Sequence, residues 1–472
     1  MPSIRVAAPL LMLLLSGCVV GPDHETPATA LPVKFSEGST KSVGEVTLAP
    51  WWTAFNDRRL NGYVDRGIDQ NLSVLQALER INAAQASFDA ADAGAFPQLN
   101  GSLSQTTSEQ TGRGSLSSRS DDTTSTSTAA LNASWILDLF GQYRRSKESA
   151  KASLDAAYAS ADVAKLTFLS NVVTAYIDAR YFQERLAIAR KNLASRRETL
   201  ELTRLQLEAG AASRLDVVQS EGLVNSTLAE IPTLETNFRR SAHRIATLLG
   251  LPASTLMAEL QKGAPQPIPR RSISAGVPAD LIRNRPDIRA AERRLAAAVA
   301  QIGVNEAQLY PSISLSGNIS SSIIATSAVS GGLTPWSFGP SLNLPIFNGG
   351  RLQANVDIAE SSAREQYLAW KQTVLGAVEE VENALASVNR TRQTVNALTA
   401  TVRSYEEALS LSTASYRDGA SSLLDVLDAQ RNVSAAQANL AQAVQQMATD
   451  YVNLNVAIGG GYDFEAKTAR AM

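Results

Sequence analysis

The chain has 472 residues, of which 44% are hydrophobic, and its formal net charge at pH 7 is −2. A charge this close to zero excludes a polyacidic or polybasic protein and gives no electrostatic basis for nucleic acid as a partner. The length allows roughly two to four domains, and no apolar run reaches the roughly 18 residues that a membrane-spanning helix needs.

The predicted elements begin with a secretory signal at residues 1–17. Arg5 precedes the apolar run VAAPLLMLLL, and small residues follow that run, which is the pattern of a cleaved export signal. Cys18 is the only cysteine, so it cannot form a disulfide within the chain. LSGC, which ends at Cys18, resembles the lipobox of bacterial lipoproteins. The resemblance implies cleavage before Cys18 and covalent attachment of a diacylglycerol and an N-acyl lipid to it, with no other cofactor. The alternative is an ordinary signal peptide with an incidental cysteine.

The rest of the chain is predicted to be an internal duplication. ALERINAAQASFDAADAGAFPQLNGSLS at residues 77–104 parallels AAERRLAAAVAQIGVNEAQLYPSISLSG at residues 290–317, and Gly419 follows Gly210 by 419 − 210 = 209 residues. We therefore predict a lipid-anchored segment at 18–50, a first repeat at 51–262, a proline-rich linker at 263–280, a second repeat at 281–461 and a tail at 462–472.

Each repeat contains a very long predicted helix, then a tight turn and a returning helix. Residues 146–209 contain neither proline nor glycine, and residues 351–418 contain only Gly376. At 1.5 Å per residue, the first of these helices would be about 95 Å long. Helices of this length are typical of coiled coils and tubular assemblies.

Four segments alternate apolar and polar residues, which is the period of a strand with one apolar face. They lie at residues 97–105, 131–137, 311–323 and 338–346. A tilted membrane strand needs about 9–11 residues. The segments are therefore candidates for membrane strands, and a polar loop at residues 108–128 joins the first two.

Four strands cannot close a barrel, and an open sheet in lipid would leave the N–H and C=O groups of its edges unpaired. Two chains would supply about eight strands, whose interior fills with side chains, whereas three chains would supply about twelve and leave a channel. We therefore predict a mainly α fold with a transmembrane β part, a trimer in which four strands per chain form one shared barrel and the long helices form a coiled-coil tunnel. The alternative is a soluble β layer on helices, which the serine-rich polar face does not favour.

Both predicted turns carry the pattern Gly-x-x-Ser-x-x-Asp. Gly210 and Gly419 stand where the long helix ends, and glycine adopts the left-handed backbone that such an end requires. Ser213 and Ser422, each with an aspartate three residues later, predict a capping box for the returning helix.

Only the second turn adds Asp428 and Arg431, because the residue 209 positions before Asp428 is Gln219. Leu424, Asp428 and Arg431 share one helix face, and Asp425 lies beside it. One interpretation is a surface ion pair, worth roughly a few tenths of a kcal/mol, with Asp425 serving as a cap. The other is a constriction, in which carboxylates of three chains raise one another's pKa and attract cations.

Nothing in the sequence predicts an enzyme. The chain has two histidines, His24 and His243, and neither lies at a recognisable spacing from a nucleophile or from other metal-binding residues. We therefore expect no catalytic residue and no metal site.

Several stretches resemble the TolC/OprM family of outer-membrane efflux proteins. They are residues 50–84, 133–150, 281–298 and 309–317, together with the two turn motifs. The lipobox and the following VVGPDHETP resemble the lipoprotein branch of that family in RND efflux systems, often labelled NodT-type. Val19, where some lipoproteins carry aspartate, implies sorting to the outer membrane.

The resemblance implies a homotrimer in the bacterial outer membrane, lipid-anchored and extending into the periplasm. Such a protein is the passive, gated exit duct of a tripartite efflux pump for drugs or other small molecules. Its partners would be a periplasmic adaptor (a membrane fusion protein), an inner-membrane RND-type transporter and outer-membrane lipid. Two alternatives remain: a type I protein-secretion duct, and a periplasmic coiled-coil lipoprotein without a pore.

The resemblance also assigns roles to the turn residues. Leucine, aspartate and arginine at the matching positions line the closed aperture in the family, which implies a gate at Leu424, Asp425, Asp428 and Arg431. The turns would meet the adaptor at Gly210, Ser213, Gly419 and Ser422.

Overall fold

The computed structural model describes residues 19–38, 41, 46–110, 122–270, 275–326 and 330–463. The predicted signal and the lipid-attachment residue Cys18 lie outside the described residues, as do parts of the predicted linker and tail. None of the described helices is both long enough and apolar enough to cross a membrane.

The chain divides into two compact units. Unit 1 comprises the described residues of Met1–Ala28, Ile81–Ala157 and Ala291–Trp370, and it contains the β-sheet. Unit 2 comprises those of Thr29–Arg80, Tyr158–Ala290 and Lys371–Met472, and it contains the main apolar core and both hairpin turns.

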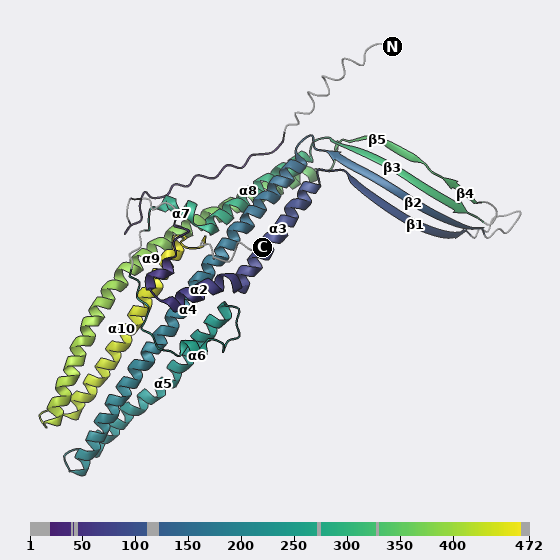
Figure 1. Cartoon of the computed structure of the whole chain (residues 1–472). Helices are drawn as coiled ribbons and strands as arrows, with labels where there is room; N and C mark the ends of the chain where they lie inside the picture. Colours follow the sequence, from purple (N-terminus) through teal and green to yellow (C-terminus); the bar gives the residue numbers. More distant parts are fainter. Residues whose placement is uncertain are drawn as a thin grey trace. The chain divides into compact units, whose positions relative to one another are not determined.

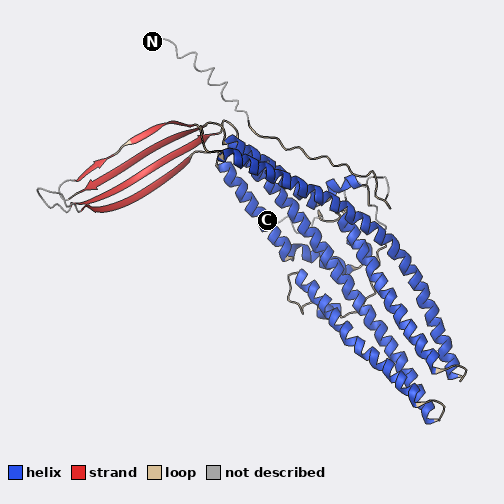
Figure 2. Cartoon of the chain, turned by 180° about the vertical axis from the view of Figure 1, so that it is seen from behind, coloured by secondary structure: helices blue, strands red, loops and turns tan. Residues whose placement is uncertain are grey.

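The sheet of unit 1 is antiparallel and has five strands in four positions (Figure 2). The strands are β1 (Gln98–Gln110), β2 (Asp122–Leu137), β3 (Ser312–Ala325), β4 (Ser330–Leu333) and β5 (Trp336–Asn343). The short β4 and the longer β5 both pair with β3, one after the other, so they occupy one position. Pro335 lies between them, and its carbonyl accepts the N–H of Ser320 at 3.0 Å. A proline has no N–H for the ladder, which accounts for the interruption.

The register gathers apolar side chains on one face of the sheet. Gly101, Leu131, Ile319 and Trp336 are directly paired across the four positions. The next residues along two of these strands belong to the polar face, where Asn318 Nδ2 donates to Asn132 Oδ1 at 2.6 Å. The four predicted period-two strands are confirmed, but β4 was not foreseen and the last strand ends at Asn343 and not at residue 346. The predicted loop at residues 108–128 was wrong at both ends, because Ser108–Gln110 pair with Asp122–Thr124 and the strands extend through polar residues.

Two helical hairpins form the long part of the fold (Figure 1). The first consists of α4 (Gln142–Glu208) and α5 (Arg214–Leu248), the second of α9 (Arg351–Arg417) and α10 (Leu423–Ala457). Both long helices have 67 residues and both returning helices have 35. The start of each element is displaced by the same amount, 351 − 142 = 209 and 423 − 214 = 209. The predicted long helices are confirmed.

Shorter helices precede each hairpin. They are η1 (Trp51–Phe55), α2 (Arg58–Gln70) and α3 (Leu72–Ala93) before the first hairpin, and α6 (Met257–Leu260), α7 (Pro278–Asn284) and α8 (Pro286–Ala307) between the first hairpin and the second. Helices α3 and α8 both have 22 residues. Proline suits the first turn of a helix, where its missing N–H would have no intrahelical partner, and α7 and α8 both begin with one.

The main apolar core of unit 2 brings η1 together with the C-terminal part of α10. Trp51 Nε1 donates to the carbonyl of Gly460 at 3.0 Å, and Phe55 packs edge-on against Tyr451 with ring centroids 5.4 Å apart. Residues of α2, α4, α5 and α10 complete this core. This core therefore fixes α4, α5 and α10 at the end away from the turns, and smaller apolar clusters lie nearer the turns.

Candidate functional site at the two hairpin turns

The two turns have the same backbone. Gly210 and Gly419 have φ of +73° and +72°, and a Cβ at either position would meet nothing within 4 Å. Glycine is therefore required by the left-handed backbone and not by crowding. Ala211 N donates to Gln206 O at 2.7 Å and Gly210 N to Leu207 O at 3.0 Å, the two bonds of a Schellman motif. The second turn repeats both bonds.

Each returning helix starts with a complete capping box. Ser213 Oγ accepts the N–H of Asp216 at 3.2 Å, while the carboxylate of Asp216 accepts from Ser213 N at 2.8 Å and from Ser213 Oγ at 2.7 Å. Ser422 and Asp425 make the same three bonds. The predicted capping boxes are confirmed. The carboxylate of Asp425 is thus engaged in its own turn, and its place at an aperture stays a prediction.

The gate candidates lie on the exposed face of α10. Arg431 Nη1 and Asp428 Oδ1 are 2.7 Å apart, and about half of each side chain is exposed. Leu424 is 52% exposed, one turn before Asp428, whereas Val426 and Leu427 between them are buried. The pair is the i,i+3 ion pair of the first interpretation. Both side chains remain accessible to a neighbouring chain.

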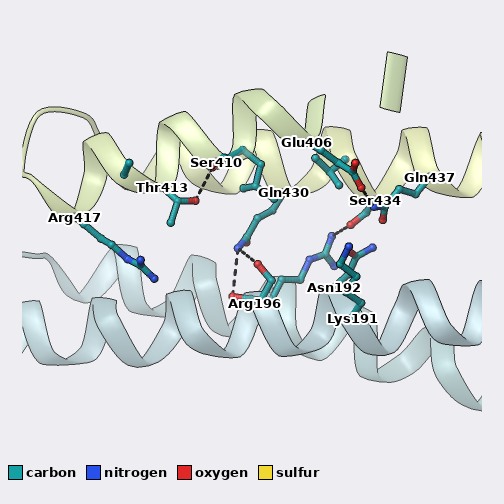
Figure 3. A pocket seen from close by; sticks show the side chains of 14 residues that line it. Lys191, Asn192, Arg196, Glu406, Ser410, Thr413, Arg417, Gln430, Ser434 and Gln437 are labelled. Carbon is teal, nitrogen blue, oxygen red and sulfur yellow. Dashed lines mark hydrogen bonds between the residues drawn. The ribbon is translucent and has the colours of Figure 1, made fainter. Parts of the chain in front are cut away.

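A polar groove separates the first hairpin from the second near their turns (Figure 3). Its volume is about 460 Å³, and α4, α9 and α10 line it. Arg196 Nη2 donates to Ser434 Oγ at 2.8 Å, and Gln430 Nε2 donates to Thr199 Oγ1 at 2.8 Å. Both bonds join α4 to α10, so polar contacts connect the two hairpins here.

These contacts belong to a layer of buried polar side chains, which we call the polar layer. Its members are Arg196, Thr199, Thr203, Ser220, Thr227, Gln430 and Gln437. Apolar contacts accompany it: one cluster joins α4 to α5 within the first hairpin, and another, around Tyr416 and Leu423, also includes Leu202 of α4 and Leu223 of α5. Sequence reasoning missed the layer, although polar residues at 196, 199 and 203 follow the spacing of a helix seam.

Arg196 is the charged member of the polar layer. Burial lowers the pKa of its guanidinium, the nearby Glu230 raises it, and the positive charge of Arg431 lowers it. Its Nε has no hydrogen-bond partner. Arg417 and Glu198 form a further ion pair between the hairpins.

The exposed parts of both turns include all four predicted adaptor-contact residues. Gly210, Ser213, Gly419 and Ser422 are exposed. Both turns lie at the same end of unit 2, side by side in the two opposite views (Figures 1 and 2). The structure thus brings the predicted contact residues together in one place.

Known proteins share both the sequence and the fold. The profile of the outer membrane efflux protein family matches residues 64–251 and again residues 277–460. The chain is 58% identical to Nodulation protein T of Rhizobium leguminosarum bv. viciae over 465 residues, 98% of this chain and 94% of that protein. It is 33% identical to outer membrane protein OprJ of Pseudomonas aeruginosa over 466 residues, 98% of this chain and 97% of that protein. Among solved structures, the outer-membrane channel OprN matches with a TM-score of 0.84 at 32% identity, over 94% of this chain and 100% of that chain.

Proposed function

Because the chain belongs to the outer membrane efflux protein family, we infer that it works as a trimeric, lipid-anchored exit duct. The protein is an outer-membrane efflux channel of the kind found in tripartite pumps, and it extends into the periplasm. What we propose beyond this is that three chains assemble and share one barrel, that Cys18 carries lipid, and that an adaptor and a transporter are the partners.

The observation that carries the proposal is the open sheet of unit 1. Among the described strands, β1 pairs only with β2, and β4 and β5 pair only with β3, so both edges are left for other strands. The apolar face is strongly exposed, with Trp336 at 76% and Phe338 at 70%. Both features suit a sheet that joins copies edge to edge in lipid. Three copies give about twelve strands and a water-filled interior lined by the asparagine–serine face.

The equal hairpins support a duplicated, tubular periplasmic part. The family profile matches each half once, and the paired helices have identical lengths. Three chains would place six similar hairpins around one axis. The exposed turns at Gly210, Ser213, Gly419 and Ser422 would meet the periplasmic adaptor, which in turn binds an inner-membrane RND-type transporter.

We propose a gate at the second turn, formed by Asp428 and Arg431 with Leu424 and Asp425. The support is the exposure of Leu424, Asp428 and Arg431 on one face, and the restriction of Asp428 and Arg431 to one of two otherwise matching turns. The polar layer also supports it. The hydrogen bonds between the hairpins can be exchanged for bonds to water when the hairpins separate, whereas the apolar contacts of Leu202 and Leu223 with the second hairpin would lose their burial.

The duct is tested with the purified, lipidated protein in planar lipid bilayers. We expect discrete single-channel currents and a trimer in detergent that dissociates only on heating. A periplasmic coiled-coil lipoprotein gives no current, and that result would refute the proposal. Identifying the inner-membrane protein that co-purifies after cross-linking in cells separates an efflux pump from a type I secretion system.

The gate is tested by replacing Asp428 and Arg431 together with alanine. We expect a higher mean conductance, because three ion pairs would leave the constriction. Gln219→Ala is the matched control, since Gln219 holds the position of Asp428 in the first hairpin and is also exposed. Equal conductance of the double variant and the wild type would contradict a gate at these residues.

A further inference from the structure

The first described residues are bound tightly within unit 1. Val20 N donates to Phe140 O at 3.1 Å, in the connection between β2 and α4. Arg145, in the first turn of α4, donates from Nε to Val20 O at 3.0 Å and from Nη2 to Gly21 O at 2.8 Å. The same Nη2 lies 2.9 Å from Asp23 Oδ1. One guanidinium therefore binds three acceptors of the N-terminal segment.

The guanidinium of Arg145 is itself almost fully enclosed. Its side chain is 4% exposed, and Nη1 donates to Glu148 Oε2 at 2.8 Å. All three of its nitrogen atoms thus have acceptors. Burying an arginine is unfavourable unless its donors are satisfied, so removing the N-terminal segment would leave this charge poorly partnered. The segment and Arg145 stabilise each other.

Glycines allow the segment to approach this closely. A Cβ on Gly21, whose φ is +87°, would lie 2.4 Å from the Cα of Gly303 in α8. A Cβ on Gly303 would lie 2.9 Å from Val20 O, and one on Gly141 would lie 2.7 Å from Val19 Cγ1. Any side chain at these positions would displace the segment. Gly141 and Gly303 therefore form a cradle for residues 19–21.

The contact continues along α8. His24 Nε2 lies 2.6 Å from Glu292 Oε1, and both side chains are nearly buried. Arg293 also donates to the carboxylate of Glu292, at 2.5 and 2.6 Å. The segment is thus held at two places, by Arg145 and by Glu292.

The other repeat carries no such site. The counterpart of Arg145 is Ala354 (354 − 145 = 209), and the counterpart of Gly303 in the alignment of residues 77–104 with 290–317 is Ala90 (303 − 90 = 213). Gly350 matches Gly141 and has φ of +86°, but a Cβ there would meet nothing within 4 Å. The arginine and the close glycine occur only where the N-terminal segment lies. This asymmetry argues that they serve the segment and not the general fold.

We propose that Arg145, with the cradle of Gly141 and Gly303, is a binding site for the chain's own N-terminus that fixes the lipid-attachment point beside the junction of β2 and α4. Cys18 directly precedes Val19 in the sequence, so a lipid on Cys18 would be attached one residue away from this binding site. The acyl chains then enter the membrane at one position on the protein, and not at the end of a loose tether. The position of the lipid rests on the lipidation proposed above, whereas the binding of residues 19–24 does not depend on it.

Hydrogen exchange of the purified full-length protein tests the clamp. In Arg145→Leu we expect the peptide covering residues 19–25 to exchange about tenfold faster or more, because its bound carbonyls lose their donor. Peptides from α10 should be unchanged. Arg144→Leu is the matched control, since that neighbouring guanidinium turns to Asp138 at 3.2 Å. Equal exchange of residues 19–25 in wild type and Arg145→Leu would overturn the proposal.

A second variant covers the case in which Arg145→Leu fails to fold. Gly303→Ala keeps the arginine and disturbs the cradle through its Cβ, so it should loosen the same peptide. Both variants are also treated with a glutamate-specific protease, which can cut after the exposed Glu25. We expect rapid release of the N-terminal peptide from the variants and slow release from the wild type; equal release rates would count against the clamp. The mass of the released peptide shows separately whether Cys18 carries lipid.

Discussion

At the scale of single residues, the same chemical change should have opposite effects at two glycines. Gly419 has a left-handed backbone and open space around it, whereas Gly222 lies inside α5 with equally open space. The difference between the two sites is therefore the backbone conformation alone. An alanine is strained in the first conformation and favoured in the second.

We expect Gly419→Ala to destabilise the second turn by about 1 kcal/mol and Gly222→Ala to stabilise α5 by about 0.5–1 kcal/mol. The measurement is the free energy of local opening, from hydrogen exchange of peptides that cover each site. Slower exchange around residue 419 in the alanine variant would show that the turn does not need its left-handed residue.

Asp178 gives a prediction for the effect of pH. Burial raises the pKa of this carboxyl above its ordinary value of 3.8, although the hydrogen bond from Gln445 opposes the shift. The folded protein then holds the proton more tightly than the unfolded chain. The resulting stability is fully present below pH 3.8 and is lost as pH rises through the folded pKa. At neutral pH, the ionised Asp178 therefore lowers stability.

Asp178→Asn should consequently raise the thermal midpoint at pH 7 and have a smaller effect near pH 4. An amide can still accept the hydrogen bond of Gln445. Asp65→Asn, at an exposed position on α2, provides the baseline for removing one carboxylate. An effect of Asp178→Asn that is the same at both pH values would contradict the assigned cause.

At the scale of elements, the sheet distinguishes two neighbouring residues of β5. Phe338 pairs with Gly317 on the apolar face, and Ser337 pairs with Asn318 on the polar face. If the apolar face contacts lipid, an arginine at position 338 costs up to about 2–4 kcal/mol. An arginine at position 337 would face the water-filled interior.

We therefore expect Phe338→Arg to reduce the amount of heat-modifiable trimer in the outer membrane, whereas Ser337→Arg assembles normally. The amount of trimer in each variant is measured by gel electrophoresis with and without heating. The reverse order, with Ser337→Arg the more harmful, would mean that the sheet presents its other face to lipid.

The elements also show what sequence reasoning can reach. The first long helix was predictable because residues 146–209 contain neither proline nor glycine, the residues that most often end a helix. The capping boxes were predictable because Ser-x-x-Asp forms its bonds within one helical turn. The polar layer was not predictable, because the sequence does not show which face of α10 is covered by another helix. It therefore does not tell a buried polar residue such as Gln430 from an exposed one such as Asp428. The binding of residues 19–24 was equally hidden, since Arg145 and Glu292 lie more than a hundred residues from the segment that they hold.

At the scale of the whole molecule, the equal lengths of the hairpins are a functional requirement if both turns meet one adaptor. Seven residues added to each arm of one hairpin would lengthen it by about 10 Å. We would place them between Thr203 and Gly210 in α4, and between Asp216 and Ser220 in α5, outside most of the polar layer.

We expect this protein to form channels in bilayers but to lose efflux in cells, measured as susceptibility to an exported compound. Adding seven residues to each arm of the second hairpin as well should restore part of the efflux, because the two hairpins would again be equally long. Full efflux with only one lengthened hairpin would show that the adaptor does not need both turns at one height.

The bound N-terminus also has a consequence for how the chain matures. Its binding site is complete only when Gly303 is present, 303 − 20 = 283 residues after Val20. Contacts between such distant segments form late, because the entropy of closing the intervening chain must be overcome first. Residues 19–24 are therefore synthesised early but bind to their site late. A glutamate-specific protease should therefore cut after Glu25 rapidly in newly made chains and slowly in mature ones. The rate of this cleavage would then report how far assembly has progressed.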